Sequence, residues 1–170
     1  MSGKALNVLF LCAGNSARSI LAEVLLEHWG KGRFKAYSAG SSPKGRVHPL
    51  ALALLEERGL PMQGLSSKSW EEFARPGAPQ LDFLVTLCDE AAGEVCPIWP
   101  GKPVCAHWGL RDPAAARGTE EERKEAFREA FQQIEERIRA FIALASETRD
   151  PQALEPRAKV IGRGVGEGAT

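Results

Sequence analysis

The sequence has no excess of charge of either sign. Its 170 residues carry 22 lysines and arginines against 22 aspartates and glutamates, so the formal net charge is zero. Proteins that bind nucleic acids or membrane surfaces usually carry a basic excess, so this balance argues against both partners. The chain also lacks a run of about 18 consecutive apolar residues, the minimum for a transmembrane helix. The composition therefore indicates a globular protein that binds neither nucleic acid nor membrane.

Cysteine is scarce, and a secretory signal is missing. The four cysteines are Cys12, Cys88, Cys96 and Cys105. A domain of this size buries roughly 68–70% of its unfolded surface, so it needs no disulfide framework. The first apolar stretch follows a single lysine and is interrupted by Asn7, which argues against a signal peptide. We therefore expect a cytosolic protein whose cysteines are catalytic, redox-active or simply buried.

Short apolar runs alternate along the chain with helical patterns. The runs predicted to be strands are 5–12, 34–38, 81–87 and 104–108. The ranges predicted to be helices are 18–29, 49–58 and 119–145. The last of these begins with Thr119 and Glu122 in a capping-box pattern. The alternation predicts an α/β fold with a four-stranded, mainly parallel sheet flanked by helices.

Residues 146–170 have a different composition. They contain few large apolar residues, two prolines (Pro151 and Pro156) and four glycines from Gly162 onward. Such a segment buries too little apolar surface to offset its ordering entropy. The sequence therefore predicts one domain over residues 1–145 and a flexible C-terminal tail.

The chemistry is expected in the segment between the first strand and the first helix. Ligands of open α/β sheets bind at the carboxyl ends of the strands, where a helix N-terminus offers N–H groups to an anion. The residues between Cys12 and Arg18 are small, so their N–H groups can surround one tetrahedral oxyanion. Gly14 and Asn15 also tolerate left-handed conformations. The predicted oxyanion-binding residues are Ala13, Gly14, Asn15, Ser16, Ala17, Arg18 and Ser19.

Two side chains of this segment suit catalysis. The planar guanidinium of Arg18 can hold two oxygens of a bound anion. Cys12 precedes the loop, and positive surroundings of this kind favour the thiolate over the thiol. The features that bind an oxyanion therefore also prepare a nucleophile.

A cysteine, five residues, an arginine and a serine in this setting resemble the low-molecular-weight protein tyrosine phosphatase family. Further motifs resemble the arsenate reductases of that fold, over roughly residues 4–145. They are Tyr37-Ser38-Ala39-Gly40, His48-Pro49, Leu87-Cys88-Asp89-Glu90, Cys96-Pro97, His107-Trp108-Gly109 and Asp112-Pro113. In the phosphatases, aromatic residues after the Asp-Pro hold the substrate ring, whereas three alanines follow Pro113 here. The resemblance thus implies a small inorganic substrate.

The resemblance implies a relay of three thiols. The Cys12 thiolate attacks the arsenic of arsenate, and Asp112 protonates the departing oxygen as general acid. Cys88 then attacks Cys12, arsenite leaves, and a Cys12–Cys88 disulfide remains. Cys96 attacks Cys88 and moves the disulfide to the Cys88–Cys96 pair, which an external thiol reduces.

The resemblance also assigns supporting residues and partners. Arg18 and the loop amides stabilise the anion, while Asn15 and Ser19 brace the thiolate and the loop. Phosphate and sulfate compete with arsenate, no cofactor is tightly bound, and a monomer is expected. The reductant is thioredoxin, with glutathione and glutaredoxin as the competitor. The choice stays open because seven residues separate Cys88 from Cys96, one more than in thioredoxin-coupled members.

The spacing of the two later cysteines predicts a conformational change. Eight residues of continuous helix span about 12 Å, whereas disulfide-bonded Cα atoms lie within about 7 Å. Gly93, between Cys88 and Cys96, weakens a helix there. If the segment is helical when reduced, it must unwind on oxidation, so we predict a redox-switched loop at 88–97.

Several other residues receive structural interpretations. Cys105 lies in an apolar run and is expected to be a buried core thiol. His107 and Trp108 are expected to be structural. Glu23 and Ser38 match positions where some family members hold potassium, although solvated or capping roles are the simpler interpretation. The histidines and cysteines show no compact metal-ligand spacing, so no metal is predicted.

Two alternatives to a reductase remain open. A phosphatase acting on phosphotyrosine or a small phosphoester would need Cys12, Arg18 and Asp112 but neither Cys88 nor Cys96. A non-catalytic oxyanion-binding module would bind arsenate or phosphate without turnover.

Overall fold

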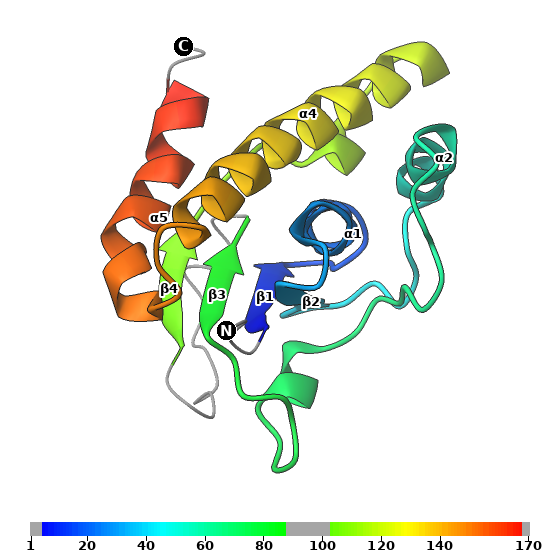
Figure 1. The fold of residues 1–170 in the computed structure, drawn as a ribbon. Helices are drawn as coiled ribbons and strands as arrows, with labels where there is room; N and C mark the ends of the chain where they lie inside the picture. The colour runs from blue at the N-terminus through cyan, green and yellow to red at the C-terminus, as the bar shows by residue number, and fades with distance from the viewer. Residues whose placement is uncertain (1–4, 88–102, 168–170) are drawn as a thin grey trace.

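The computed structural model describes residues 5–87 and 103–167 and forms an α/β fold (Figure 1). Its strands are β1 (Leu6–Cys12), β2 (Phe34–Gly40), β3 (Phe83–Thr86) and β4 (Val104–His107). They lie in the order β2-β1-β3-β4, and all three neighbouring pairs are parallel. The predicted four-stranded parallel sheet is therefore confirmed. Because β1 and β3 occupy the centre, the loop after β1 lies at the middle of the carboxyl edge.

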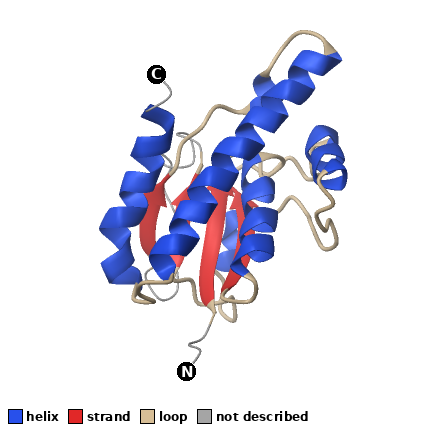
Figure 2. Ribbon diagram, turned by 45° about the horizontal axis from the view of Figure 1, so that its top comes forward, coloured by secondary structure: helices blue, strands red, loops and turns tan. Residues whose placement is uncertain are grey.

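Helices cover the sheet from one face. The helices are α1 (Arg18–Gly30), α2 (Pro49–Glu57), α4 (Glu120–Ala145) and α5 (Pro151–Glu167), with short 3-10 helices η1 (Trp70–Phe73) and η2 (Pro113–Ala115). Helices α1, α4 and α5 pack side by side on that face (Figure 2). No helix of the described residues is long and apolar enough to cross a membrane.

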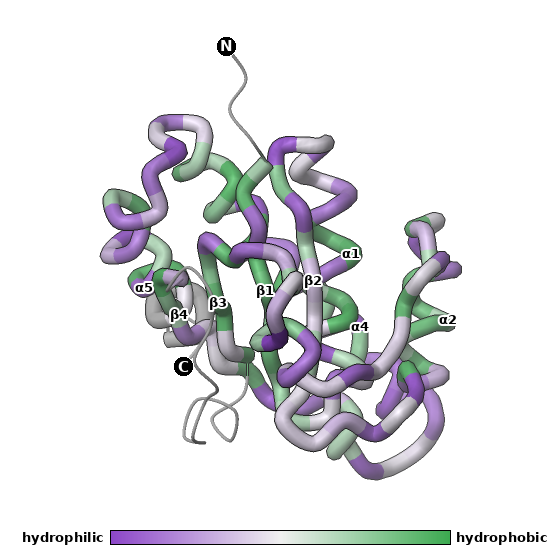
Figure 3. Tube along the Cα trace, turned by 90° about the horizontal axis from the view of Figure 1, so that it is seen from below, coloured by the Kyte–Doolittle hydropathy of each residue, from purple (hydrophilic) through white to green (hydrophobic). Residues whose placement is uncertain are grey.

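The core gathers around Phe141 of α4. Its ring contacts Phe34 of β2, Phe83 of β3 and Trp108 after β4, with centroids 5.1–5.7 Å apart. One aromatic side chain thus joins α4 to three parts of the sheet. Along α1, green and purple stretches alternate in Figure 3, yet nine of its 13 residues are buried, so this central helix is enclosed on more than one side.

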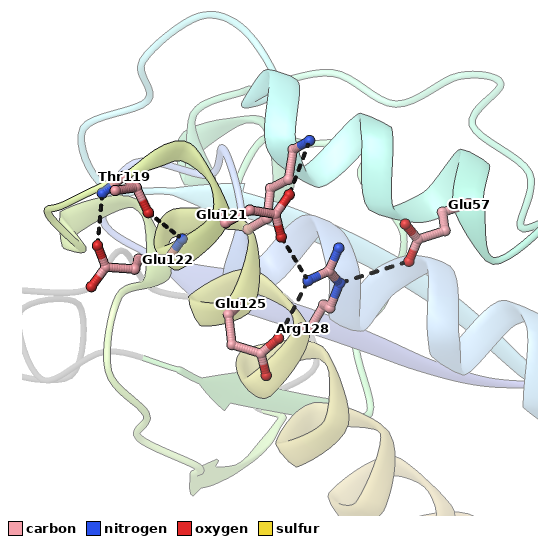
Figure 4. Close-up of polar contacts among 7 residues, drawn as sticks. Glu57, Thr119, Glu121, Glu122, Glu125 and Arg128 are labelled. Carbon is pink, nitrogen blue, oxygen red and sulfur yellow. Dashed lines mark hydrogen bonds and ion pairs between the residues drawn. The ribbon is translucent and has the colours of Figure 1, made fainter.

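The predicted capping box begins helix α4. Thr119 Oγ1 accepts from the N–H of Glu122, and Glu122 Oε1 accepts from the N–H of Thr119. Hydrogen bonding of its carboxylate to the backbone N–H and the side chain of Thr119 lowers the pKa of Glu122. One turn further on, Arg128 lies among Glu121, Glu125 and Glu57, the last on α2 (Figure 4). The exposed ion pair to Glu57, at 3.9 Å, adds little to the packing of α2 against α4.

The expectation of a separate flexible tail is wrong for the described part of that segment. Residues 151–167 form helix α5, which packs on α4 and β4. The large apolar residues of this segment are few, but their spacing is helical. Leu154, Ala158 and Ile161 recur at helical intervals on one side of α5, and all three are buried. Their burial makes this helix part of the same core.

Helix α5 approaches β4 unusually closely. The Nε1–H of Trp108 donates to the carbonyl oxygen of Ala158 at 2.9 Å. A Cβ added to Gly162 would lie 2.0 Å from the carbonyl oxygen of His107. Glycine is therefore required at this crossing point, and Trp108 is structural, as predicted.

The expected burial of Cys105 is also wrong: this thiol is exposed. Among the described strands, β4 pairs only with β3, so it lies at the edge of the sheet. Successive side chains of a strand point to opposite faces, and Ala106 is the buried neighbour. An apolar run at a sheet edge thus buries one alternate set of side chains and leaves Cys105 outside.

Candidate active site

The loop of residues 13–17, called the anion loop below, joins β1 directly to α1. Cys12 ends β1 with 2% of its surface exposed, and Arg18 begins the helix. Asn15 has a φ of 44°, so it adopts the left-handed conformation that the sequence suggested. Gly14 does not, although it was the other candidate. A single asparagine therefore turns the chain around the loop.

Three carbonyl groups of the anion loop accept hydrogen bonds from backbone N–H groups outside the loop. The bonds run from Ser42 N to Ala13 O at 2.9 Å, from Lys44 N to Gly14 O at 3.0 Å, and from His48 N to Ser16 O at 2.8 Å. The N–H groups of Gly14, Asn15 and Ser16, in contrast, donate to no residue that the structure describes. With its carbonyls held outward, the loop can offer these N–H groups to an oxyanion.

A chain of hydrogen bonds ends at the Cys12 sulfur. The N–H of Lys68 donates to Asn15 Oδ1 at 2.8 Å, and Asn15 Nδ2 donates to Ser19 Oγ at 2.7 Å. Ser19 Oγ lies 3.0 Å from Cys12 Sγ. Because Ser19 already accepts from Asn15, its own hydrogen is available to the sulfur. The arrangement suits a thiolate, which is the better acceptor.

Gly40 lets β2 pass close to the anion loop. A Cβ at this position would lie 2.5 Å from the carbonyl oxygen of Ala13 and 2.9 Å from that of Cys12. No real side chain tolerates such distances to backbone atoms. Gly40, noted in the sequence only as part of a family motif, therefore sets the spacing between strand and loop.

Arg18 connects the anion loop to the segment of residues 109–116, called the acid loop below. Its Nη1 donates to the carbonyl oxygen of Leu110 at 3.1 Å, and its Nη2 lies 3.6 Å from Asp112 Oδ2. The other oxygen of Asp112 accepts from Ala114 N at 2.9 Å and caps η2. Asp112 keeps 35% of its side chain exposed. Arg18, which directly follows the anion loop, therefore also contacts Asp112.

Glu23 and Ser38, the positions compared with a potassium site, lie next to the ammonium group of Lys68. Ser38 Oγ donates to Glu23 Oε1 at 2.6 Å. The ammonium of Lys68 donates to the carbonyl oxygens of Ser38 and Ser66, at 3.1 and 2.9 Å. Burial raises the pKa of Glu23, and the Ser38 bond and the Lys68 charge oppose that rise. With an ammonium on the Ser38 carbonyl, these residues do not fit a potassium ion.

His48 borders the anion loop and caps helix α2. Its Nδ1 accepts from the N–H of Leu50 at 3.0 Å, which requires the ring nitrogen to be unprotonated. Burial lowers the pKa of His48, and the charges of Arg123 and Lys44 lower it further. A neutral ring is therefore part of the local fold.

Some predicted residues lie outside the site or outside the described residues. Cys88, Cys96 and the predicted switch at 88–97 fall within residues 88–102, which the structure does not describe. His107 is exposed, and its Nδ1 lies 2.7 Å from Thr86 Oγ1. Within the described residues, no group of three histidine, cysteine or acidic side chains could hold a metal.

Lys68 is a site residue that no pattern in the sequence marks. Its contributions are a backbone N–H to Asn15 and an ammonium on two carbonyls, and neither leaves a motif.

The parallel sheet, the buried cysteine and the anion loop define a phosphatase fold, and the family comparison agrees with them. Residues 7–152 match the low molecular weight phosphotyrosine protein phosphatase family. The chain belongs to this family.

Two relatives with which the chain shares more than 30% identity are both named arsenate reductases. The chain is 38% identical over 138 residues to an arsenate reductase of Halalkalibacterium halodurans, covering 79% of this chain and 93% of the relative. It is 32% identical over 139 residues to a glutaredoxin arsenate reductase of Synechocystis, covering 82% and 98%.

Solved structures point the same way. An arsenate reductase in a phosphate-binding state matches with a TM-score of 0.66 and 32% identity, over 81% of this chain and 97% of that one. A thioredoxin-dependent arsenate reductase of Corynebacterium glutamicum matches with a TM-score of 0.61 and 28% identity, over 85% of this chain. The match spans 65% of that protein's length.

Proposed function

We propose that this protein reduces arsenate to arsenite with Cys12 as the nucleophile. The observation that carries the proposal is the hydrogen-bond chain that ends on Cys12 Sγ, beside the N–H groups of Gly14, Asn15 and Ser16, which donate to no described residue. The named arsenate reductases that match this chain over nearly their whole length support the choice of substrate.

The first half of the reaction needs only residues that the structure describes. The loop N–H groups and Arg18 bind the oxygens of arsenate. The Cys12 thiolate attacks arsenic, an S–As bond forms, and Asp112 gives a proton to the oxygen that departs as water. Arg18 would then exchange its contact with Asp112 for contacts with the substrate.

The second half transfers two electrons through the later cysteines. The Cys88 thiolate attacks Cys12 Sγ, an S–S bond forms, and the electron pair of the S–As bond stays on arsenic, which leaves as arsenite. Cys96 attacks Cys88, releases the Cys12 thiolate and leaves a Cys88–Cys96 disulfide. An external dithiol then reduces this pair. The proposed relay requires a reducing compartment, and the cytosol stays our prediction.

The reductant is proposed to be thioredoxin, because one matching structure carries that dependence in its name. Glutaredoxin with glutathione is the competitor, supported by the name of the Synechocystis relative. Phosphate and sulfate are expected to compete with arsenate at the anion loop, since all three are tetrahedral oxyanions.

The phosphatase alternative fits the same loop, but the substrate ring has no platform. Ala114 and Ala115 follow Pro113 in η2 and present only methyl groups. Weak hydrolysis of a phosphoester would be compatible with reduction, because both use Cys12, Arg18 and Asp112. Only the dependence on Cys88 and Cys96 separates the two activities.

The test is NADPH consumption with arsenate, comparing thioredoxin and its reductase with glutathione and glutaredoxin. Cys88→Ser and Cys96→Ser are expected to abolish turnover. Cys105→Ser is the matched control and should retain it, because that thiol is exposed at the sheet edge. Turnover that survives loss of Cys88 and Cys96, or phosphoester hydrolysis without arsenate reduction, would overturn the proposal.

A further inference from the structure

A cavity of about 760 Å³ lies between the acid loop and helix α4. One side of the cavity is formed by the acid loop, with Leu110, Asp112 and Pro113. The other side is formed by α4, with Ala126, Ala130 and Arg137. Gly162 of α5 also lines it. Among the described residues, neither Cys12 nor any member of the anion loop lines it. The cavity is therefore separate from the proposed arsenate site, although the two share Asp112.

Arg137 is the unusual member of this lining. It is 1% exposed, and its Nη1 donates to the carbonyl oxygens of Trp108 and Gly109, at 2.7 and 3.1 Å. Its Nε is buried and has no hydrogen-bond partner, and Nη2 donates to no residue that the structure describes. A guanidinium that could donate five hydrogen bonds makes only two.

A buried positive charge of this kind calls for an anion. Within residues 5–87 and 103–167, no carboxylate lies within 4.0 Å of the Arg137 guanidinium. Removing a guanidinium from water without a counter-charge is costly. Burial accordingly lowers the pKa of Arg137, and the charge of Glu136, which is not in hydrogen-bond contact with the guanidinium, opposes this only in part. An anion entering the cavity would supply the missing acceptor oxygens.

The other charges of the lining select the kind of anion. Asp112 already faces Arg18, and Glu129 is exposed on α4. These two carboxylates disfavour a dianion, although the exposed Arg111 partly offsets them. The methyl groups of the alanines offer apolar contact but no hydrogen bond. A single negative charge with a short hydrocarbon part fits these surroundings best.

We propose that this cavity is a binding site for a small aliphatic monocarboxylate, whose carboxylate pairs with Arg137. The hydrocarbon part of the ligand lies against Ala130, which lines the same cavity about two helical turns before Arg137. Because Arg137 also holds the carbonyls of Trp108 and Gly109, the ligand acts on the stem of the acid loop. It therefore affects Asp112 without competing for the anion loop.

The test is an NMR titration of the reduced, full-length chain with sodium butyrate and, separately, with inorganic phosphate. Butyrate is expected to shift the amide signals of residues 109–116 and 126–137 in a saturable way. Phosphate is expected to shift those of residues 13–19. Butyrate shifts confined to residues 13–19, or none that saturate, would overturn the proposal. No turnover is measured, so the result is independent of the proposed reductase activity.

Three variants complete the experiment. Arg137→Met should weaken butyrate binding roughly tenfold to a hundredfold, the effect of losing a charged hydrogen bond. Ala130→Leu fills the part of the cavity that would hold the hydrocarbon chain, and it decides the question if Arg137→Met does not fold. Ala143→Leu, at an exposed position of the same helix, is the matched control and should bind as the wild type does. Unchanged binding in the folded Arg137→Met or Ala130→Leu variant would contradict the assignment.

Discussion

Two loops meet at the candidate site, and they are held in place in different ways. The anion loop is fixed by backbone groups of residues 42–48 and 68, and its polar side chains are buried. In the acid loop, arginine side chains bind the carbonyls of Leu110 and Gly109, from Arg18 and Arg137 respectively, whereas the backbone bonds to Asp112 and Pro113 stay within the loop itself. Asp112 itself is partly exposed. The loop beside Cys12, the proposed nucleophile, is therefore held by the backbone of other segments, whereas the loop of Asp112, the proposed acid, depends on charged side chains to hold it from outside.

Replacement of the arginine shared by both loops should have the largest effect. Arg18→Lys removes the planar fork that contacts Leu110 and Asp112 and that we propose to hold the substrate anion. We expect kcat/KM for arsenate to fall by about 10²–10³, as when one oxyanion donor is removed. Arg157→Lys, in an exposed ion pair with Glu147, is the control and should change little. A fall in Arg18→Lys no larger than in the control would mean that the fork has no role.

Helix α5 packs on β4, the strand that leads to the acid loop. A substitution that loosens the packing of α5 therefore tests how the acid loop is held. Leu154 is fully buried, and Leu154→Ala is expected to lower the free energy of unfolding by about 2–5 kcal/mol. Val160→Ala, 57% exposed on the same helix, should stay within about 0.5 kcal/mol of the wild type. Urea denaturation measures both. Equal, small effects would restore the flexible tail that the composition suggested.

A substitution at Gly40, beside the anion loop, tests how that loop is held in place. Gly40→Ala places a methyl group against the carbonyls of Ala13 and Cys12, and we expect a loss of about 1–3 kcal/mol in unfolding free energy. The matched change Gly14→Ala meets only the flexible side chain of Lys44, the nearest atom at 3.1 Å, and should cost less. If Gly14→Ala were the more damaging of the two, the close approach of β2 would not be what fixes the loop.

The smallest effect is expected from a change of pH, which alters the stability of the folded protein through His48. Because the pKa of His48 is lowered in the folded protein, the unfolded chain binds a proton first as the pH falls below the ordinary value of 6.5. Stability is complete above that value and declines as acidification proceeds toward the lower, folded pKa. His48→Asn keeps a cap for α2 but does not titrate. Its melting temperature should drop less between about pH 7.5 and about pH 5.5 than that of the wild type.

Local patterns in the sequence predicted most of the fold and the rigid half of the site. The apolar runs located all four strands, and Thr119 with Glu122 marked the start of α4. The segment after Cys12 predicted an oxyanion loop because its small residues and its arginine act through their immediate neighbours.

What the sequence did not predict depends on strand order and on contacts between distant residues. The exposure of Cys105 follows from the edge position of β4, which no local pattern encodes. Arg137 looks like any helical arginine until α4 is packed beside the acid loop, 28 residues away in sequence from Gly109. Lys68 acts on Asn15 through its backbone, so its side-chain type carried no signal.

The carbonyl contacts of the anion loop also imply an order of assembly during synthesis. Every contact described above for that loop comes from the first 68 residues, including the Lys68 N–H at the head of the hydrogen-bond chain. The acid loop waits for Arg137 and, through Trp108, for Ala158. A chain leaving the ribosome therefore carries these partners of its anion loop before half of it is made. Asp112, the proposed acid, joins Cys12 only when translation is nearly complete.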